Sequence, residues 1–116
     1  MTQPYFERLS VGLHESHPPK PHGVLVECRH FFSGAALYAN GRIFASLTLA
    51  GFAIELSERS RSALLRERRG RPLRYFKGGP IKKAYVVLSR ESASDHAAVR
   101  KLLRASIRHV THDESV

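Results

Sequence analysis

Apolar and polar positions change period along the chain, and these changes mark its segments. From residue 24 onward the apolar positions recur with a period near two and include many β-branched and aromatic residues, which is typical of strands. We expect strands over residues 27–39, 42–49 and 52–56. Asn40-Gly41 separates the first two, and both residues tolerate the positive φ angles of a type I′ turn, which predicts a β-hairpin.

A helical pattern follows the third strand. Ser57 is a suitable N-cap, apolar residues then lie among arginines, and Gly70 is the expected stop. Residues 72–89 indicate a strand, a Gly-Gly-Pro turn and another strand. Ser92 or Ser94 caps a last predicted helix, whose inward face carries Ala98, Val99, Leu102, Leu103, Ser106, Ile107 and Val110.

The N-terminal 23 residues have a different character. Residues 4–13 fit a short helix, and "HESHPPKPHG" after them is an extended connector because its prolines exclude regular structure. Residues 111–116 form a tail, which leaves 24–110 as the domain, with room for one hydrophobic core. The order helix, three strands, helix, two strands, helix predicts an α+β fold of two layers, with three helices and a five-stranded antiparallel sheet.

The formal net charge is +9, and it is concentrated in one stretch. Residues 59–83 hold ten Lys and Arg and one acidic residue, whereas the other 91 residues hold nine of each sign. This is typical of a surface for nucleic acid, anionic lipid head groups or an acidic protein, and also of a solvated face that only aids solubility. The candidate binding residues form one predicted cationic face: Arg66, Arg68, Arg69, Arg71, Arg74, Lys77, Lys82 and Lys83.

A cationic face binds phosphates without reading bases, and its affinity falls with salt. Tyr75 or Phe76, if exposed, would stack on unpaired bases. We expect at least one of them to face the core, because neighbours in a strand point to opposite faces.

The core of this stretch, Arg69-Gly70-Arg71-Pro72, is spelled like an AT-hook, a segment that lies extended in the minor groove of A·T-rich DNA. The alternative is an ordinary junction in which Gly70 stops the helix and Pro72 opens a strand. We favour the junction, because the residues after Pro72 look like strand residues that face a core.

Metal binding and catalysis find little support. Three of the seven histidines lie in or beside the connector, and Cys28 is the only cysteine, whereas structural zinc usually takes four closely spaced ligands. Cys28 and His30 would share one face of a strand, but no third group orients them. We expect no enzyme, no metal and no cofactor.

Nothing in residues 1–23 fits a signal peptide, and the longest mostly apolar stretch, 42–56, is too short to span a membrane. We therefore expect a cytoplasmic protein without membrane association.

Residues 29–45, "RHFFSGAALYANGRIFA", resemble the signature (K/R)-x-M-F-G-x-x-x-L-Y-x-x-G-x-M-F-A of the N-terminal domain of TfoX/Sxy competence regulators. Residues 72–89, "PLRYFKGGPIKKAYVVLS", are similar to that family's P-F-x-x-x-x-G-x-x-x-x-x-Y-V-x-L-P block, and a closing helix follows. The resemblance covers about Val24 to Val110. It departs from the family at Phe31, Ser33 and Ser89, where the signatures have Met, Gly and Pro.

The resemblance implies a two-layer α+β fold like that of type III secretion chaperones, with a five-stranded antiparallel sheet that is often dimeric. Stand-alone members of the family have no established biochemical activity to carry over. Two functions remain open. One is a non-enzymatic regulatory or adaptor domain whose cationic face binds nucleic acid or an acidic protein. The other is a homodimeric sheet platform for protein or peptide binding, in which the charge serves only solubility.

Overall fold

The computed structural model describes residues 23–32 and 34–112. The predicted helix over 4–13 and nearly all of the connector therefore lie outside the described residues. The described chain contains six strands and three helices: β1 (Val26–Phe31), β2 (Gly34–Ala39), β3 (Arg42–Thr48), β4 (Gly51–Glu55), α2 (Glu58–Arg66), β5 (Gly70–Leu73), β6 (Lys82–Leu88), α3 (Arg90–Ser94) and α4 (His96–His112).

All the strands form one antiparallel sheet in the order β1-β2-β3-β4-β6-β5. The predicted α+β class is confirmed, but the prediction of five strands is wrong. The expected strand over 27–39 is two strands, because the chain reverses after Phe31, which pairs with Gly34. Phe32 takes a positive φ of 52° at this turn. Bulky residues rarely adopt that conformation, so no turn was predicted at this position.

Gly34 allows the first hairpin to close against β3. A Cβ at this position would lie 2.2 Å from the carbonyl oxygen of Leu47. The predicted hairpin at Asn40-Gly41 is confirmed, since the two residues have φ angles of 51° and 83°. The Asn40 side chain also accepts a hydrogen bond of 2.8 Å from the amide of Leu25, which fixes the chain just before β1.

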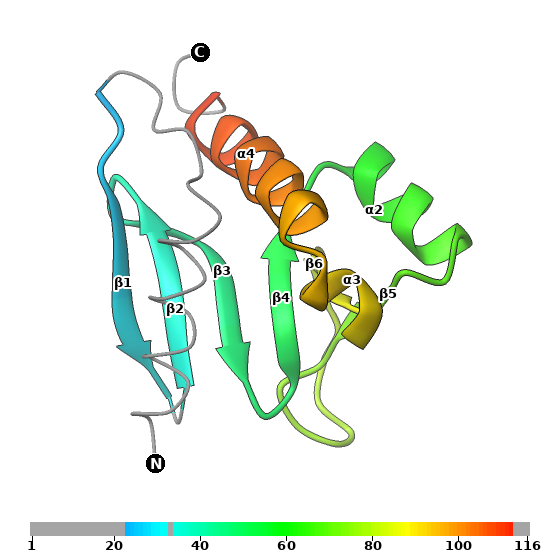
Figure 1. Cartoon of the computed structure of the whole chain (residues 1–116). Helices are drawn as coiled ribbons and strands as arrows, with labels where there is room; N and C mark the ends of the chain where they lie inside the picture. The colour runs from blue at the N-terminus through cyan, green and yellow to red at the C-terminus, as the bar shows by residue number, and fades with distance from the viewer. Residues whose placement is uncertain (1–22, 33, 113–116) are drawn as a thin grey trace.

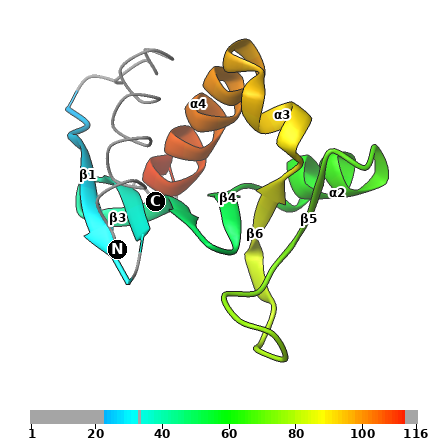
Figure 2. The same cartoon turned by 60° about the horizontal axis from the view of Figure 1, so that its bottom comes forward.

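The three helices cover one face of the sheet (Figures 1 and 2). In Figure 1, α4 runs obliquely across β2, β3 and β4, and α2 lies beside β5 and β6. The main core fills the space between the two layers. Its largest fully buried side chains include Phe44, Leu37, Ile54, Leu103 and Ile107.

The opposite face of the sheet carries a smaller apolar cluster. Ala53 and Val87 are buried in it, whereas their strand neighbours Ile54 and Val86 belong to the main core, as expected from the alternation of side chains along a strand. Tyr75 and the other partly buried residues of this cluster, Ala50 and Tyr85, pack around it. We call this side, which none of the described helices covers, the open face.

Helix ends follow the predicted chemistry only in part. Ser57 caps α2, as predicted, by accepting from the amide of Ser60. The predicted cap of the last helix at Ser92 or Ser94 is wrong. Ser89 caps the short helix α3, and Asp95 then accepts from the amides of Ala97 and Ala98 at the start of α4.

Gly70 does not stop α2. The helix ends at Arg66, and Arg68 takes the left-handed conformation after it, with φ 58°. The amides of Arg68 and Arg69 bond back to the carbonyls of Leu65 and Leu64, which is the Schellman arrangement. Gly70 instead begins β5, where a Cβ would lie 2.7 Å from a methyl of Val86.

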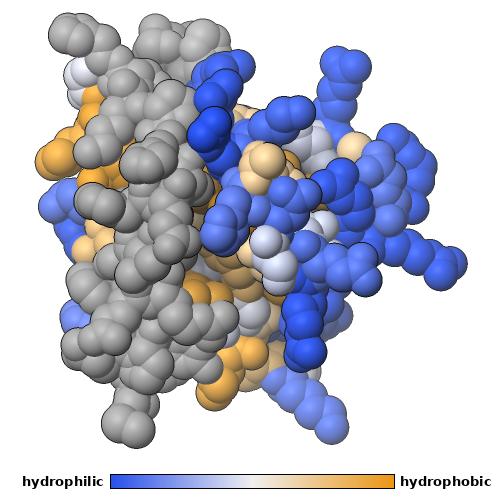
Figure 3. Space-filling view, in the orientation of Figure 1, coloured by the Kyte–Doolittle hydropathy of each residue, from blue (hydrophilic) through white to orange (hydrophobic). Residues whose placement is uncertain are grey.

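Among the described residues, no helix has both the length and the apolar character needed to cross a membrane. On the side of the molecule seen in Figure 3, hydrophilic residues gather over α2, α3 and α4, at right, and apolar residues emerge at the lower edge near the β3–β4 turn.

Candidate nucleic-acid interface

All eight residues of the predicted cationic face are exposed to solvent. The structure divides them into two groups along the chain, one before β5 and one that begins on it; β5 is one of the two edge strands of the sheet. The helix-end group follows α2 and consists of Arg66, Arg68 and Arg69. The hairpin group lies on β5, on the following loop and at the start of β6, and consists of Arg71, Arg74, Lys77, Lys82 and Lys83.

The helix-end group lies toward the helical layer. Arg69 donates to the hydroxyl of Ser92 at 3.4 Å and pairs with Glu67 at 3.5 Å. It also lines a hollow of about 350 Å³ together with Lys101 and Asp95 at the start of α4. The nearby carboxylates reduce the positive charge available to a ligand at this end.

The hairpin group extends from Arg71, on β5, through the β5–β6 loop to Lys83, at the start of β6. Arg71 donates to the carbonyl of Ala50 at 2.8 Å, and Arg74 donates to the carbonyl of Gly79, so both guanidinium groups are positioned by backbone oxygens. Arg71 and Arg74 also line a shared hollow of about 310 Å³ at the edge of the sheet. Among the described residues, no carboxylate pairs with any member of this group.

The segment spelled like an AT-hook is part of the sheet. Gly70, Arg71 and Pro72 pair with Leu88, Val87 and Val86 of β6. Their backbone is therefore committed to the sheet, with Pro and Arg on an edge strand, where they discourage further strand pairing. The prediction of a strand that begins at Pro72 was two residues late, because Gly70 and Arg71 already belong to it.

A pocket of about 630 Å³ opens on the open face, next to the hairpin group. Five of its lining residues are aromatic: Phe31, Phe32, Tyr75, Phe76 and Tyr85. The others are Ile43, Thr48, Leu49, Pro80 and Lys82, so the lining has one charged side chain, which is cationic. We call this site the aromatic pocket. Figure 2 shows the β5–β6 loop extending away from the helices on this side.

Several rings of the pocket are positioned by contacts with one another. The ring of Phe31 lies 4.5 Å from that of Phe32 and 5.8 Å from that of Tyr75, between centroids. The hydroxyls of Tyr75 and Ser46 share a hydrogen bond of 3.2 Å, and burial raises the pKa of Tyr75. Phe32 and Phe76 stay exposed at 78% and 66%.

The expected burial of at least one of Tyr75 and Phe76 holds in part. Tyr75 is half-buried, whereas Phe76 is exposed in the loop after β5 instead of in a strand. The pocket itself was missed from the sequence. Its signal was the apolar run 84–88, in which both faces of β6 carry apolar side chains, so that neither face is simply solvated.

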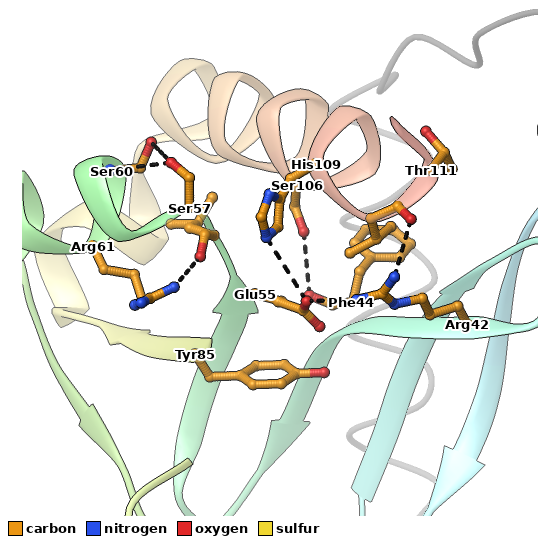
Figure 4. Close-up of polar contacts among 12 residues, drawn as sticks. Arg42, Phe44, Glu55, Ser57, Ser60, Arg61, Tyr85, Ser106, His109 and Thr111 are labelled. Atoms are coloured by element: carbon orange, nitrogen blue, oxygen red, sulfur yellow. Dashed lines mark hydrogen bonds and ion pairs between the residues drawn. The ribbon is translucent and has the colours of Figure 1, made fainter. Parts of the chain in front are cut away.

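A polar cluster beneath α4 was also missed (Figure 4). The Glu55 carboxylate is nearly buried; it accepts from Arg42 at 3.1 Å and lies 3.9 Å from Nε2 of His109. Arg42 also donates to the carbonyl of Val110, which ties the end of α4 to β3. Burial, followed by the nearby Glu55 carboxylate, raises the pKa of Tyr85 well above its usual value of 10.0. The contacts made by this cluster join the helical layer to the sheet.

The other candidate residues, Cys28 and the histidines, do not form a metal site within the described part of the chain. Cys28 is half-buried in β1 and faces Leu37 across the pair of strands. Among the described residues, no three His, Cys, Asp or Glu side chains are grouped as metal ligands. The histidines of the connector lie outside that part of the chain.

No family model matches this chain, and no curated protein matches it.

Proposed function

We propose that this chain is a non-enzymatic binding domain of the TfoX N-terminal type, acting as a regulatory or adaptor module, and that it binds nucleic acid through its hairpin group. One observation carries the proposal: five exposed cations on β5, the β5–β6 loop and the start of β6 have no carboxylate partner among the described residues, and one of them, Lys82, lines the aromatic pocket. Cations bind backbone phosphates, and exposed rings stack on unpaired bases.

The test compares two surfaces that carry the same charge. One variant replaces Lys77, Lys82 and Lys83 by Ala, which removes three cations of the hairpin group without disturbing the backbone contacts of Arg71 and Arg74. The matched control replaces Arg100, Arg104 and Arg108, which are exposed on α4, by Ala. Both proteins have the same net charge, so any difference between them reports the location of the site.

The measurement is fluorescence anisotropy with labelled duplex and single-stranded oligonucleotides at about 50 and 200 mM salt. Each phosphate contact contributes about 0.9 to the slope of log affinity against log salt for a duplex. We expect the hairpin variant to lose about two to three units of that slope and the α4 control to lose less than one. Equal losses would mean that binding follows net charge alone, and they would refute the hairpin group as the site.

An acidic protein is the alternative to nucleic acid as the ligand of the same cations. Unlabelled polyglutamate serves as the competitor. If it displaces the oligonucleotides at equal charge concentration, the hairpin group binds anionic polymers in general, and the assignment to nucleic acid fails.

A homodimeric sheet platform is a second candidate function, favoured by a separate observation. Leu49 is 84% exposed in the β3–β4 turn at the rim of the open face. Light scattering tests it: a dimer that Leu49→Ser converts to a monomer would support this candidate, whereas a monomer at high concentration would exclude it.

A further inference from the structure

We propose that the aromatic pocket is a base-binding subsite for single-stranded nucleic acid, in which an unpaired base stacks on Phe32 and Phe76 while neighbouring phosphates contact Lys82 and the hairpin group. This inference rests on the proposed function and adds to it the class of nucleic acid and the residues that select it.

The residues that line the pocket suit a ligand that carries both an aromatic ring and a negative charge. Pockets of about 300 to 1,000 Å³ that are mostly apolar, with a few polar groups, are typical of ligand sites, and this one has about 630 Å³. Lys82 is the charged residue of its lining, and no carboxylate lines it. A base attached to a phosphate backbone supplies both the flat ring and the negative charge that such a lining accepts.

Charge complementarity separates this occupant from a second copy of the chain. A symmetric dimer places the same surface of both copies at the interface. Packing two open faces together here would bring together two chains that each carry a net charge of +9, which arises entirely within 59–83. Like charges at an interface oppose association. A polyanion carries the opposite charge, so its interaction with the hairpin group is attractive.

The backbone at Phe32 supports a role for its ring outside the core. Its φ of 52° is unfavourable for a phenylalanine, yet its side chain is 78% exposed. The strain therefore does not serve to bury the ring. Strained residues of this kind cluster at binding sites, where the conformation aims a side chain at a ligand.

Phe76 is positioned by a glycine. A Cβ at Gly79 would lie 2.8 to 3.0 Å from three atoms of the Phe76 ring. The glycine lets the ring lie close against the backbone of the β5–β6 loop while 66% of the residue stays exposed. Phe76 and Phe32 thus contribute exposed rings from two segments that are far apart in the sequence.

Single strands are favoured over duplexes by this geometry. The bases of a duplex are paired and already stacked, so they reach a pocket only after unpairing. An unpaired base offers its face directly, and stacking on one aromatic side chain strengthens binding by roughly five- to a hundredfold.

The experiment uses three labelled probes: a single strand of thymidines, an abasic strand of the same length and charge, and a duplex. The variants are Phe32→Ala/Phe76→Ala, Gly79→Ala, and the control Leu65→Ala, which removes a partly exposed apolar side chain on α2. Circular dichroism and urea unfolding show whether each variant retains its fold.

We expect the wild-type protein to bind the thymidine strand on the order of tenfold or more tightly than the abasic strand. The double variant should bind the thymidine strand only as well as the abasic one, with its affinity for the abasic strand and the duplex unchanged. Gly79→Ala should shift affinity in the same direction, and Leu65→Ala should match the wild type.

The outcomes separate the two proposals. Equal wild-type affinity for thymidine and abasic strands would overturn the base subsite and leave the phosphate-binding function intact. No salt-dependent binding to any probe would overturn both. Equal weakening of all three probes by the double variant, or a wild-type dimer that this variant dissociates, would also overturn the subsite, because the rings would then support the fold or a second copy.

Discussion

The ring of Phe32 meets the ring of Tyr75 edge on, with centroids 6.0 Å apart. This contact joins the β1–β2 turn to the loop after β5. The two segments are far apart in the sheet, because β1 and β5 are its two edge strands. It defines one side of the aromatic pocket, and it does so with a phenylalanine in a left-handed conformation. Phe32 therefore lines the pocket although its backbone conformation is unfavourable for a phenylalanine.

Replacing Phe32 by Gly should separate stability from binding. Glycine removes a left-handed penalty of about 1–2 kcal/mol, while the ring contacts that are lost with Phe31 and Tyr75 contribute about 0.5–1.5 kcal/mol each. We expect the unfolding free energy in urea to stay within about 1 kcal/mol of the wild type, since these terms offset one another. Binding to a thymidine strand should weaken.

Phe31→Gly is the matched control, because Phe31 is half-buried in β1 and does not share the positive φ. It should cost about 2 kcal/mol or more, through lost packing and a glycine within a strand. Equal costs for the two variants would show that Phe32 has a structural role like that of its neighbour.

The sequence predicted those parts of the fold in which local chemistry and tertiary structure agree. Asn40-Gly41 carries the residues that its turn needs, and Ser57 carries the oxygen that its cap needs. The turn at Phe32 was missed because tertiary contacts hold a residue that local preference disfavours. At the end of α2 the left-handed position falls on Arg68, while Gly70 is needed for a close approach to Val86.

The candidate site was predictable to the extent that it depends on composition. The concentration of cations is visible in residues 59–83, and their exposure follows from their charge. Their division into two groups depends on where α2 ends and β5 begins. The aromatic pocket combines residues from the β1–β2 turn, β3, the β5–β6 loop and β6, and no local pattern brings these segments together.

Arg68→Gly should stabilise the protein. Arg68 occupies the left-handed position after α2, where glycine has no Cβ penalty. The relief of this penalty exceeds the extra entropy of glycine in the unfolded chain, so we expect a gain of about 0.5–1 kcal/mol in urea unfolding.

The control is Arg66→Gly, which removes the same charge inside the last turn of α2. Glycine within a helix costs about 0.5–1 kcal/mol, so the two variants should shift the unfolding midpoint in opposite directions. A loss of stability in both would argue that the Arg68 side chain contributes more than its backbone costs.

Arg42 and Glu55 should be energetically coupled. The Glu55 side chain is 10% exposed, and that of Arg42 is 37% exposed. Glu55→Gln leaves the guanidinium without its ionic partner, and we expect a cost of about 1–3 kcal/mol. Arg42→Met also removes the hydrogen bond to Val110. The double variant should cost less than the sum of the two, by about 0.5–2 kcal/mol.

The more exposed pair of Arg29 and Glu27, at 2.8 Å, is the reference for this cycle. Glu27→Gln should cost less than about 0.5 kcal/mol, because water screens exposed pairs. Strict additivity at Arg42 and Glu55 would show that their ion pair contributes nothing to the free energy of unfolding.

Alkaline pH should destabilise the fold through Tyr85. Burial, then the nearby Glu55 carboxylate, raises the pKa of this phenol above its usual value of 10.0. The folded state therefore holds the phenolic proton more tightly than the unfolded state does. The resulting stability is fully present below about pH 10 and is lost as the pH rises above that value.

Urea unfolding at about pH 9, 10 and 11 should show a steeper loss for the wild type than for Tyr85→Phe, which cannot ionise. Tyr75→Phe should change the slope in the same direction, since burial raises that pKa too. If the wild type and Tyr85→Phe lost stability in parallel over this range, Tyr85 would have to ionise as readily in the folded protein as in the unfolded chain.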